Sequence, residues 1–141
     1  MSTNFLTTSS FQTRNAGIKI AKEILGRGPS KKAVVLGLVG DLGGGKTTFL
    51  QGFAKGLGIK QRITSPTFVI MKRFNNFYHL DCYRIKKPKE LMDLGFKKII
   101  SNPKNIVAIE WAGRIKKIMP KETIWINFEF INNRTRKIVI R

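Results

Sequence analysis

Residues 40–47 read GDLGGGKT and match the phosphate-binding pattern G-x-x-x-x-G-K-[ST] at every position. An apolar run, Ala33–Val39, comes directly before this loop and predicts a buried parallel strand. The residues after the loop predict a helix with Phe49, Leu50 and Phe53 on one face. A loop of this kind between a strand and a helix constrains the chain to an α/β fold of the P-loop NTPase class.

The loop has the residue types that binding of a nucleotide's phosphates requires. Glycines let successive backbone N–H groups point inward at phosphate oxygens, and the start of the following helix adds a positive dipole. Lys46 is expected to reach the β- and γ-phosphates and Thr47 to ligate Mg²⁺, whereas Asp41 is expected to hydrogen-bond the loop backbone. The residues predicted to bind the nucleotide are Asp41, Gly43, Gly44, Gly45, Lys46, Thr47 and Thr48. After the loop there is no Asn/Thr-Lys-x-Asp element of the guanine-specific hydrolases, so the predicted nucleotide is ATP.

The rest of the chain predicts one domain over residues 1–141, with a mixed sheet that is parallel at its centre and has helices on both faces. A first helix is expected from Ser9 or Ser10 to Leu25. Its predicted apolar stripe consists of Phe11, Ile18, Ala21 and Leu25 and is widened by Ile20 and Ile24. The strands and further helices are expected at Thr67–Phe74, Phe77–Asp81, Pro88–Leu94, Ile106–Ile109 and Ala112–Met119, followed by a C-terminal β-hairpin of Thr123–Ile131 and Arg136–Ile140. The segment Met1–Thr8 is polar, and no element is assigned to it.

Composition limits the compartment and the kinds of partner. The one cysteine, Cys82, cannot form an internal disulfide, and no apolar run approaches the roughly 20 residues of a membrane span. The N-terminus lacks the pattern of a signal peptide, so a cytoplasmic protein without a membrane segment is expected. The net charge is +19, from 27 Lys and Arg against 8 Asp and Glu, but the basic residues are scattered. A contact surface for RNA and a merely compositional bias both stay open.

Two acids follow predicted strands and are the candidates for hydrolytic chemistry. Glu110 ends the apolar strand Ile106–Ile109 and matches a Walker B position, and Asp81 ends another strand. A P-loop ATPase needs a magnesium-associated carboxylate and a group that holds the attacking water, so Asp81, Glu110 and Lys46 are the predicted catalytic residues. Thr47 and Glu110 are the predicted metal ligands, and which acid holds metal and which holds water stays open. His79 lies on the same strand face as Asp81 and is interpreted as structural.

A further segment lies where nucleotide hydrolases have their switch loops. Thr64, Ser65 and Thr67 fall in the first long connection after the helix of the loop. Hydroxyl groups at this place sense the γ-phosphate and Mg²⁺ in such enzymes. By chemistry alone the segment is equally well a Ser/Thr-Pro turn.

Taken together, these segments resemble the bacterial TsaE (YjeE) family. The resemblance is carried, in family order and spacing, by GDLGGGKTTFLQGFAKGLGI, ITSPTFVI, FYHLDCYRI, ELMDLGF and IVAIEWAGRI, which with the first helix cover most of the chain. It implies a slow ATPase that uses Mg²⁺ and works with the TsaD–TsaB heterodimer in threonylcarbamoyladenosine modification of tRNA. On the matched positions, Lys46 and Thr47 correspond to the phosphate and magnesium residues, Asp81 and Glu110 to the family's two acids, and Trp111 to the tryptophan beside the second acid.

The chain departs from the family at one motif. Family members commonly continue E-W-P-E-R, whereas this chain has Ala112 and Gly113 where the proline and the second glutamate stand. Any role of that glutamate is therefore not carried over. The alternative functions are a small-molecule P-loop kinase, for which no lid insertion is evident, and a basic RNA-binding module in which the nucleotide is a switch.

Overall fold

The computed structural model describes residues 3–28, 30–40, 45–64 and 70–141. The chain divides into two compact units. The helix-pair unit consists of Met1–Gly28, Gly40–Ser65 and Ile126–Arg141, and the parallel-strand unit of Pro29–Val39 and Pro66–Trp125. The elements in chain order are β1 Thr3–Thr7, α1 Ser10–Leu25, β2 Val34–Gly40, α2 Lys46–Gly56, β3 Met71–Phe74, β4 Phe77–Asp81, α3 Lys89–Met92, α4 Phe96–Ser101, β5 Ile106–Glu110, the 3₁₀ helix η1 Ala112–Ile118, β6 Ile124–Phe130 and β7 Arg136–Ile140.

Three antiparallel strands belong largely or wholly to the helix-pair unit. Strand β7 pairs with β6 on one side, which confirms the C-terminal hairpin, and with β1 on the other. Strand β1 was not predicted, because Thr3–Thr7 has no apolar alternation of its own. It forms by pairing with β7 at the far end of the sequence, where Phe5 faces Ile138 in the register.

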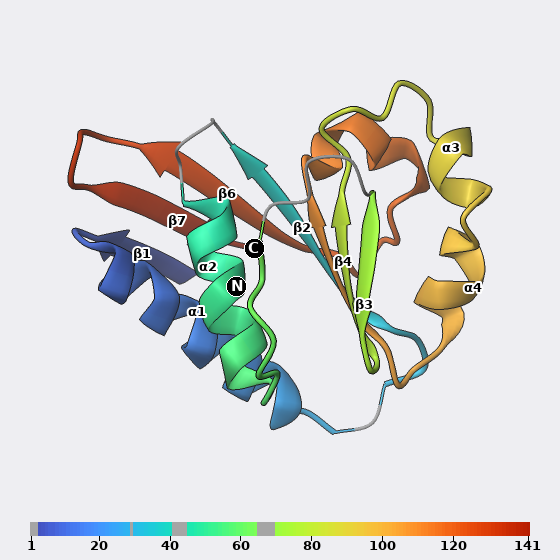
Figure 1. The fold of residues 1–141 in the computed structure, drawn as a ribbon, viewed down its shortest axis with the longest axis horizontal. Helices are drawn as coiled ribbons and strands as arrows, with labels where there is room; N and C mark the ends of the chain where they lie inside the picture. The colour runs from blue at the N-terminus through green and yellow to red at the C-terminus, as the bar shows by residue number, and fades with distance from the viewer. Residues whose placement is uncertain (1–2, 29, 41–44, 65–69) are drawn as a thin grey trace. The chain divides into compact units, whose positions relative to one another are not determined.

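Helices α1 and α2 of this unit lie side by side and approach backbone to backbone (Figure 1). A Cβ atom built on Gly52 of α2 would collide with the carbonyl oxygen of Arg14 in α1. A Cβ atom built on Gly17 of α1 would collide in the same way with the carbonyl oxygen of Phe49. The two helices can be this close only because glycine has no side chain at these positions.

The buried stripe of α1 differs from the one expected. Ser9 caps the helix as predicted, with its hydroxyl accepting the Gln12 N–H. Phe11 and Leu25, however, are 66% and 56% exposed. The buried positions are smaller on average, namely Thr13, Ala16, Gly17, Ile20, Ala21 and Ile24. Ile20, Ala21 and Ile24 of the predicted stripe are buried as expected. The prediction was wrong for Phe11 and Leu25, because close helix packing selects small residues.

The parallel-strand unit contains the parallel centre that the sequence predicted. Strand β5 pairs in parallel with β2 on one side and with β4 on the other. Strand β3 then pairs antiparallel with β4 through a turn in which Asn75 has a φ of 57°. The mixed α/β architecture is therefore confirmed.

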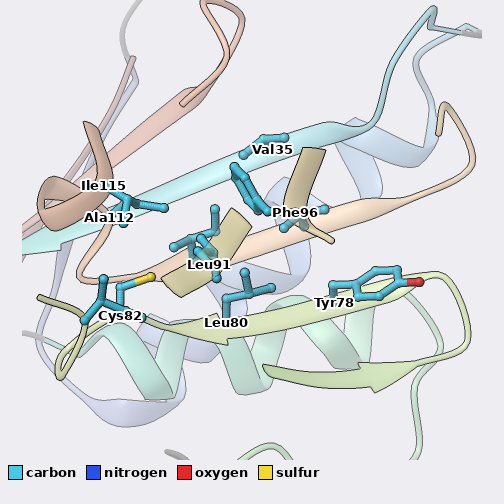
Figure 2. Close-up of a cluster of buried hydrophobic side chains, with 11 residues drawn as sticks. Val35, Tyr78, Leu80, Cys82, Leu91, Phe96, Ala112 and Ile115 are labelled. Carbon is cyan, nitrogen blue, oxygen red and sulfur yellow. The ribbon is translucent and has the colours of Figure 1, made fainter. Parts of the chain in front are cut away.

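A cluster of buried side chains holds the helices of this unit on its strands (Figure 2). Leu91 of α3, Phe96 of α4 and Ile115 of η1 pack with Leu80 of β4 and Val35 of β2. Helix α4 was not predicted, because the helix expected at Pro88–Leu94 was expected to end before Gly95. Gly95 is instead the N-cap of α4, with a φ of 84°. The segment expected to be helical over Ala112–Met119 is a 3₁₀ helix with a kink at Ile115.

None of the helices in the described part of the chain has both the length and the apolarity needed to cross a bilayer.

Candidate functional site

The helix-pair unit contains the described end of the phosphate loop and the start of α2. Gly40 ends β2 with a φ of 135°, and a Cβ atom there would collide with the carbonyl oxygen of Phe128. Gly45 is the N-cap of α2 with a φ of 97°. Both backbone conformations favour glycine, so the first and the sixth residues of the motif are fixed by backbone geometry as well as by chemistry. Asp41, Gly43 and Gly44 lie outside the described residues.

Lys46 is the first residue of α2 and is only 6% exposed. Its Nζ atom donates a hydrogen bond of 2.9 Å to the carbonyl oxygen of Gly40. Lysine is almost never this buried in a folded protein unless its ammonium group is paired, so the contact with Gly40 fixes where the charge lies. The ammonium group is thereby held next to the residue at which β2 ends.

The first turn of α2 is suited to an anion. Its backbone N–H groups have no acceptor within the helix, and the helix dipole places partial positive charge there. Helix α2, which is described in full, carries no acidic side chain in this turn. The half-buried Thr47 and Thr48 add hydroxyl groups. Backbone amides, an ammonium group and hydroxyl groups together form the chemistry of a phosphate site.

The parallel-strand unit brings the two predicted acids to one edge of its strands. Asp81 ends β4 and Glu110 ends β5, and their Cα atoms are register partners in the parallel pair. Glu110 is also the register partner of Leu38 in β2. The carboxyl ends of parallel strands are where ligands bind in open α/β sheets. Strand pairing therefore places side by side two residues that lie far apart in the sequence.

The two carboxylates have different surroundings. Glu110 is 3% exposed, and its Oε2 atom lies 2.7 Å from Nε2 of His79, which is fully buried on β4. Asp81 is half-buried, and its Oδ1 atom accepts the backbone N–H of Tyr83 at 2.9 Å. The His79–Glu110 contact was missed, because the sequence indicates only that His79 shares a strand face with Asp81. The strand register could have indicated this contact. Ala108 of β5 is the register partner of His79, and Glu110 lies two positions further along β5, on the same face as Ala108.

Aromatic side chains follow both acids. Trp111, with a φ of 57°, lies with its ring centroid 4.9 Å from that of Tyr83. The guanidinium carbon of Arg114 lies 5.6 Å from the centroid of the Tyr83 ring. Ala112, where the chain departs from the family motif, is fully buried and starts η1. Trp111 is thus a packing aromatic in this unit.

The cysteine beside Asp81 is not suited to nucleophilic chemistry. Burial raises the pKa of Cys82 to about 12, the charge of Asp81 adds to the rise, and Arg114 opposes it. The thiolate form, which is the reactive one, is therefore scarce at neutral pH.

Of the predicted switch-like residues, the structure describes Thr64, which is exposed, whereas Ser65 and Thr67 lie outside the described residues. The chain just before Thr64 is tied to α2, because the side-chain amide of Gln51 donates to the carbonyl oxygen of Ile63 at 3.1 Å.

A family model described as "Threonylcarbamoyl adenosine biosynthesis protein TsaE" matches residues 7–138 of the chain. The chain belongs to the TsaE family. This family membership confirms the resemblance that the motifs indicated. The TsaE protein of Bacillus subtilis is 40% identical over 113 residues, which cover 77% of this chain and 70% of that protein. The TsaE proteins of Haemophilus influenzae and Treponema pallidum are 34% and 32% identical, over 87% and 83% of this chain and 79% and 87% of theirs.

A solved structure agrees with the TsaE assignment. The crystal structure of YdiB from Bacillus subtilis matches with a TM-score of 0.77 and 30% sequence identity, over 99% of this chain and 84% of that one. The P-loop NTPase fold predicted from the sequence is confirmed.

Proposed function

We propose that this TsaE-family chain binds ATP with Mg²⁺ and hydrolyses it as a subunit of the machinery that makes threonylcarbamoyladenosine in tRNA. The observation that carries the proposal is Lys46, an ammonium group buried at the start of α2 and held at Gly40 by a 2.9 Å hydrogen bond. A chain that needed only a glycine turn would gain nothing from burying a lysine there. The names of the relatives supply the pathway.

In this proposal the helix-pair unit holds the triphosphate. The N–H groups at the start of α2 donate to phosphate oxygens, and Lys46 moves its ammonium group from the Gly40 carbonyl to the β- and γ-phosphates. Asp41, Gly43, Gly44 and Gly45 complete the loop as the motif predicts. These groups stabilise the charge that develops on the transferred phosphoryl group, which is the main task of such enzymes.

Thr47 and Glu110 are the proposed magnesium ligands. A hydroxyl and a carboxylate oxygen are donor types that Mg²⁺ prefers, so the residues present fit the ion. When bound, Mg²⁺ supplies positive charge to the β- and γ-phosphate oxygens. Thr64, Ser65 and Thr67 are the proposed residues that respond to the γ-phosphate.

The two acids at the strand ends divide the remaining tasks. Asp81 and Glu110 together orient the water that attacks the γ-phosphorus in line and support the metal. The backbone amide of Tyr83 already fixes one oxygen of Asp81, and the imidazole of His79 fixes one oxygen of Glu110. Two carboxylates with separately fixed oxygens are suited to separate roles.

The proposed partners are homologues of TsaD and TsaB. The test is co-purification of the three proteins with and without ATP, together with phosphate release by the chain alone and in the mixture. We expect slow release alone, faster release with the partners, and ATP-dependent association. Transfer of phosphate to a small-molecule acceptor in place of water would instead favour the kinase function.

The charge of +19 favours a second contact, between basic surface and tRNA. The test is a gel shift with tRNA at several salt concentrations. Contacts to RNA phosphates predict an affinity that falls steeply as salt rises, with a slope of about −0.7 in log–log form for each neutralised phosphate. An affinity that does not change with salt would show that the charge is compositional.

A further inference from the structure

His79 is the single histidine of the chain and is fully buried. It lies in the middle of β4, between Tyr78 and Leu80. Those two neighbours point into the buried cluster of the parallel-strand unit (Figure 2). Because side chains alternate along a strand, His79 points to the opposite face, on which Asp81 also lies. Its ring reaches across to β5 and places Nε2 2.7 Å from Oε2 of Glu110.

The surroundings of the ring indicate which nitrogen carries the proton. Within the described part of the chain, Nδ1 of His79 is buried and has no hydrogen-bond partner. A proton on Nδ1 would leave a buried donor without an acceptor, which costs about 1–3 kcal/mol. A proton on Nε2 faces the carboxylate oxygen of Glu110. A hydrogen bond donated from Nε2 to Glu110 therefore suits the surroundings of the ring best.

We propose that His79 is a positioning residue that donates from Nε2 to Glu110 and fixes the orientation of that carboxylate for ATP hydrolysis. The inference rests on the proposed function, because it gives the orientation of Glu110 a purpose. An apolar side chain would fill this place in the strand with no polar atom to satisfy. An imidazole at this place leaves Nδ1 buried without a partner, which costs free energy. The hydrogen bond from Nε2 to Glu110 explains why a histidine is nevertheless present. Residues that orient catalytic carboxylates in this way act through one fixed oxygen.

Two substitutions at His79 separate positioning from packing. In His79→Gln the side-chain amide nitrogen comes to about the place of Nε2, whereas in His79→Asn the amide nitrogen comes to about the place of Nδ1 and cannot reach Glu110. We expect the Gln variant to keep kcat for ATP hydrolysis within about fivefold and the Asn variant to lose about 10–100-fold, with KM for ATP little changed in both. A merely structural role would affect the two variants alike. Equal loss in both, or full activity of the Asn variant, would overturn the proposal.

A spectroscopic measurement on the nucleotide-free protein tests the same contact without activity. Because His79 is the single histidine, ¹⁵N-histidine labelling gives one pair of ring-nitrogen signals to assign. We expect a protonated Nε2 whose proton exchanges slowly with water, and we expect this slow exchange to be lost in Glu110→Ala. An Nε2 that carries no proton would overturn the proposal even if the His79→Asn variant fails to fold.

The proposed function fails separately from this inference. If the unmodified chain, alone and with its partners, releases no phosphate from ATP, the proposed function is wrong, whatever the ring signals show. If the chain hydrolyses ATP and Lys46→Ala abolishes this activity, the function stands and the His79 variants decide the inference alone. In a Glu110→Gln background, His79→Asn should cause no further loss of kcat, because both changes act through the same group.

Discussion

The helix-pair unit and the parallel-strand unit offer opposite kinds of chemistry by opposite means. The first presents an ammonium group and backbone amides, and its motif lies within the eight contiguous residues 40–47. The second presents two carboxylates, Asp81 and Glu110, which strand pairing alone makes neighbours. The comparison teaches that one set of functional groups is encoded by contiguous residues and the other by sheet topology, and that the two sets are open to different tests.

The two units also differ in what holds them rigid. Helix α2 packs against α1 through glycines whose neighbours are backbone atoms, and these atoms cannot move aside as a side chain can. The strands of the parallel-strand unit are held by a cluster of large side chains from three helices, which can repack (Figure 2). Adding one methyl group should therefore lower the free energy of unfolding more in the helix pair than in the side-chain cluster.

The largest effect is expected from removing the charge of the helix-pair unit. Lys46→Ala removes the ammonium group that contacts Gly40, and turnover of ATP should fall by about a thousandfold, because this group stabilises the transferred phosphoryl group. Steady-state phosphate release measures the effect. The matched control is Lys55→Ala, at the exposed last turn of the same helix, which should leave turnover unchanged. Normal hydrolysis by the Lys46 variant would refute the phosphate site.

The second-largest effect is expected at Glu110, whose carboxylate contacts the buried His79. Glu110→Ala should keep the affinity for ATP and lose about a hundredfold in turnover, because a carboxylate that orients water or metal acts on the chemical step. Fluorescent-nucleotide titration and phosphate release measure the two quantities. Glu110→Gln retains an acceptor for His79 and should lose turnover with less loss of stability. The control is Glu129→Ala, at an exposed position of β6. An alanine variant that turns over normally would show that Glu110 is not the Walker B acid.

The difference in rigidity predicts a stability effect. Gly52→Ala places a methyl group against the backbone of Arg14, and the free energy of unfolding should fall by about 2 kcal/mol or more, since neither helix can move without losing packing. Denaturant unfolding measures it. Gly28→Ala is the control, because a Cβ atom there meets nothing within 4 Å. If both variants unfold at the same denaturant concentration, the close contact of α1 and α2 does not exist in solution.

What the sequence predicted follows the division between local and long-range encoding. The phosphate-loop helix, the α1 N-cap at Ser9 and the strand ending at Glu110 were all predicted, because each has its signal within a few adjacent residues. The P-loop class followed from the order of these signals. The placement of Glu110 at the carboxyl end of a buried strand also followed from the rule for open α/β sheets. Asp81 was predicted to end a strand, but the parallel pairing of that strand with β5 was not predicted.

The failures have a common physical cause. Strand β1 depends on β7, the small residues buried in α1 depend on α2, and the His79 contact with Glu110 depends on the register of β4 against β5. Each feature depends on two segments that are distant in the sequence, so the residues of one segment alone do not predict it. Helix α4 is different, because glycine is more typical of a helix end than of the N-cap that Gly95 forms here.

The smallest effect is expected at Asp81, whose carboxylate accepts the backbone N–H of Tyr83. Its measurement also distinguishes the roles of the two carboxylates. Asp81→Asn keeps a side-chain oxygen that can accept the Tyr83 N–H, so the fold should hold while turnover falls by about tenfold with the lost charge. The control is Asp93→Asn, whose exposed ion pair with Lys89 at 3.1 Å contributes little to stability. Phosphate release at rising Mg²⁺ then divides the alternatives. If Asp81 supports the metal, excess Mg²⁺ restores turnover of the variant. If Asp81 orients the attacking water, excess Mg²⁺ restores nothing. A variant as active as the unmodified protein at every Mg²⁺ concentration would leave both tasks to Glu110.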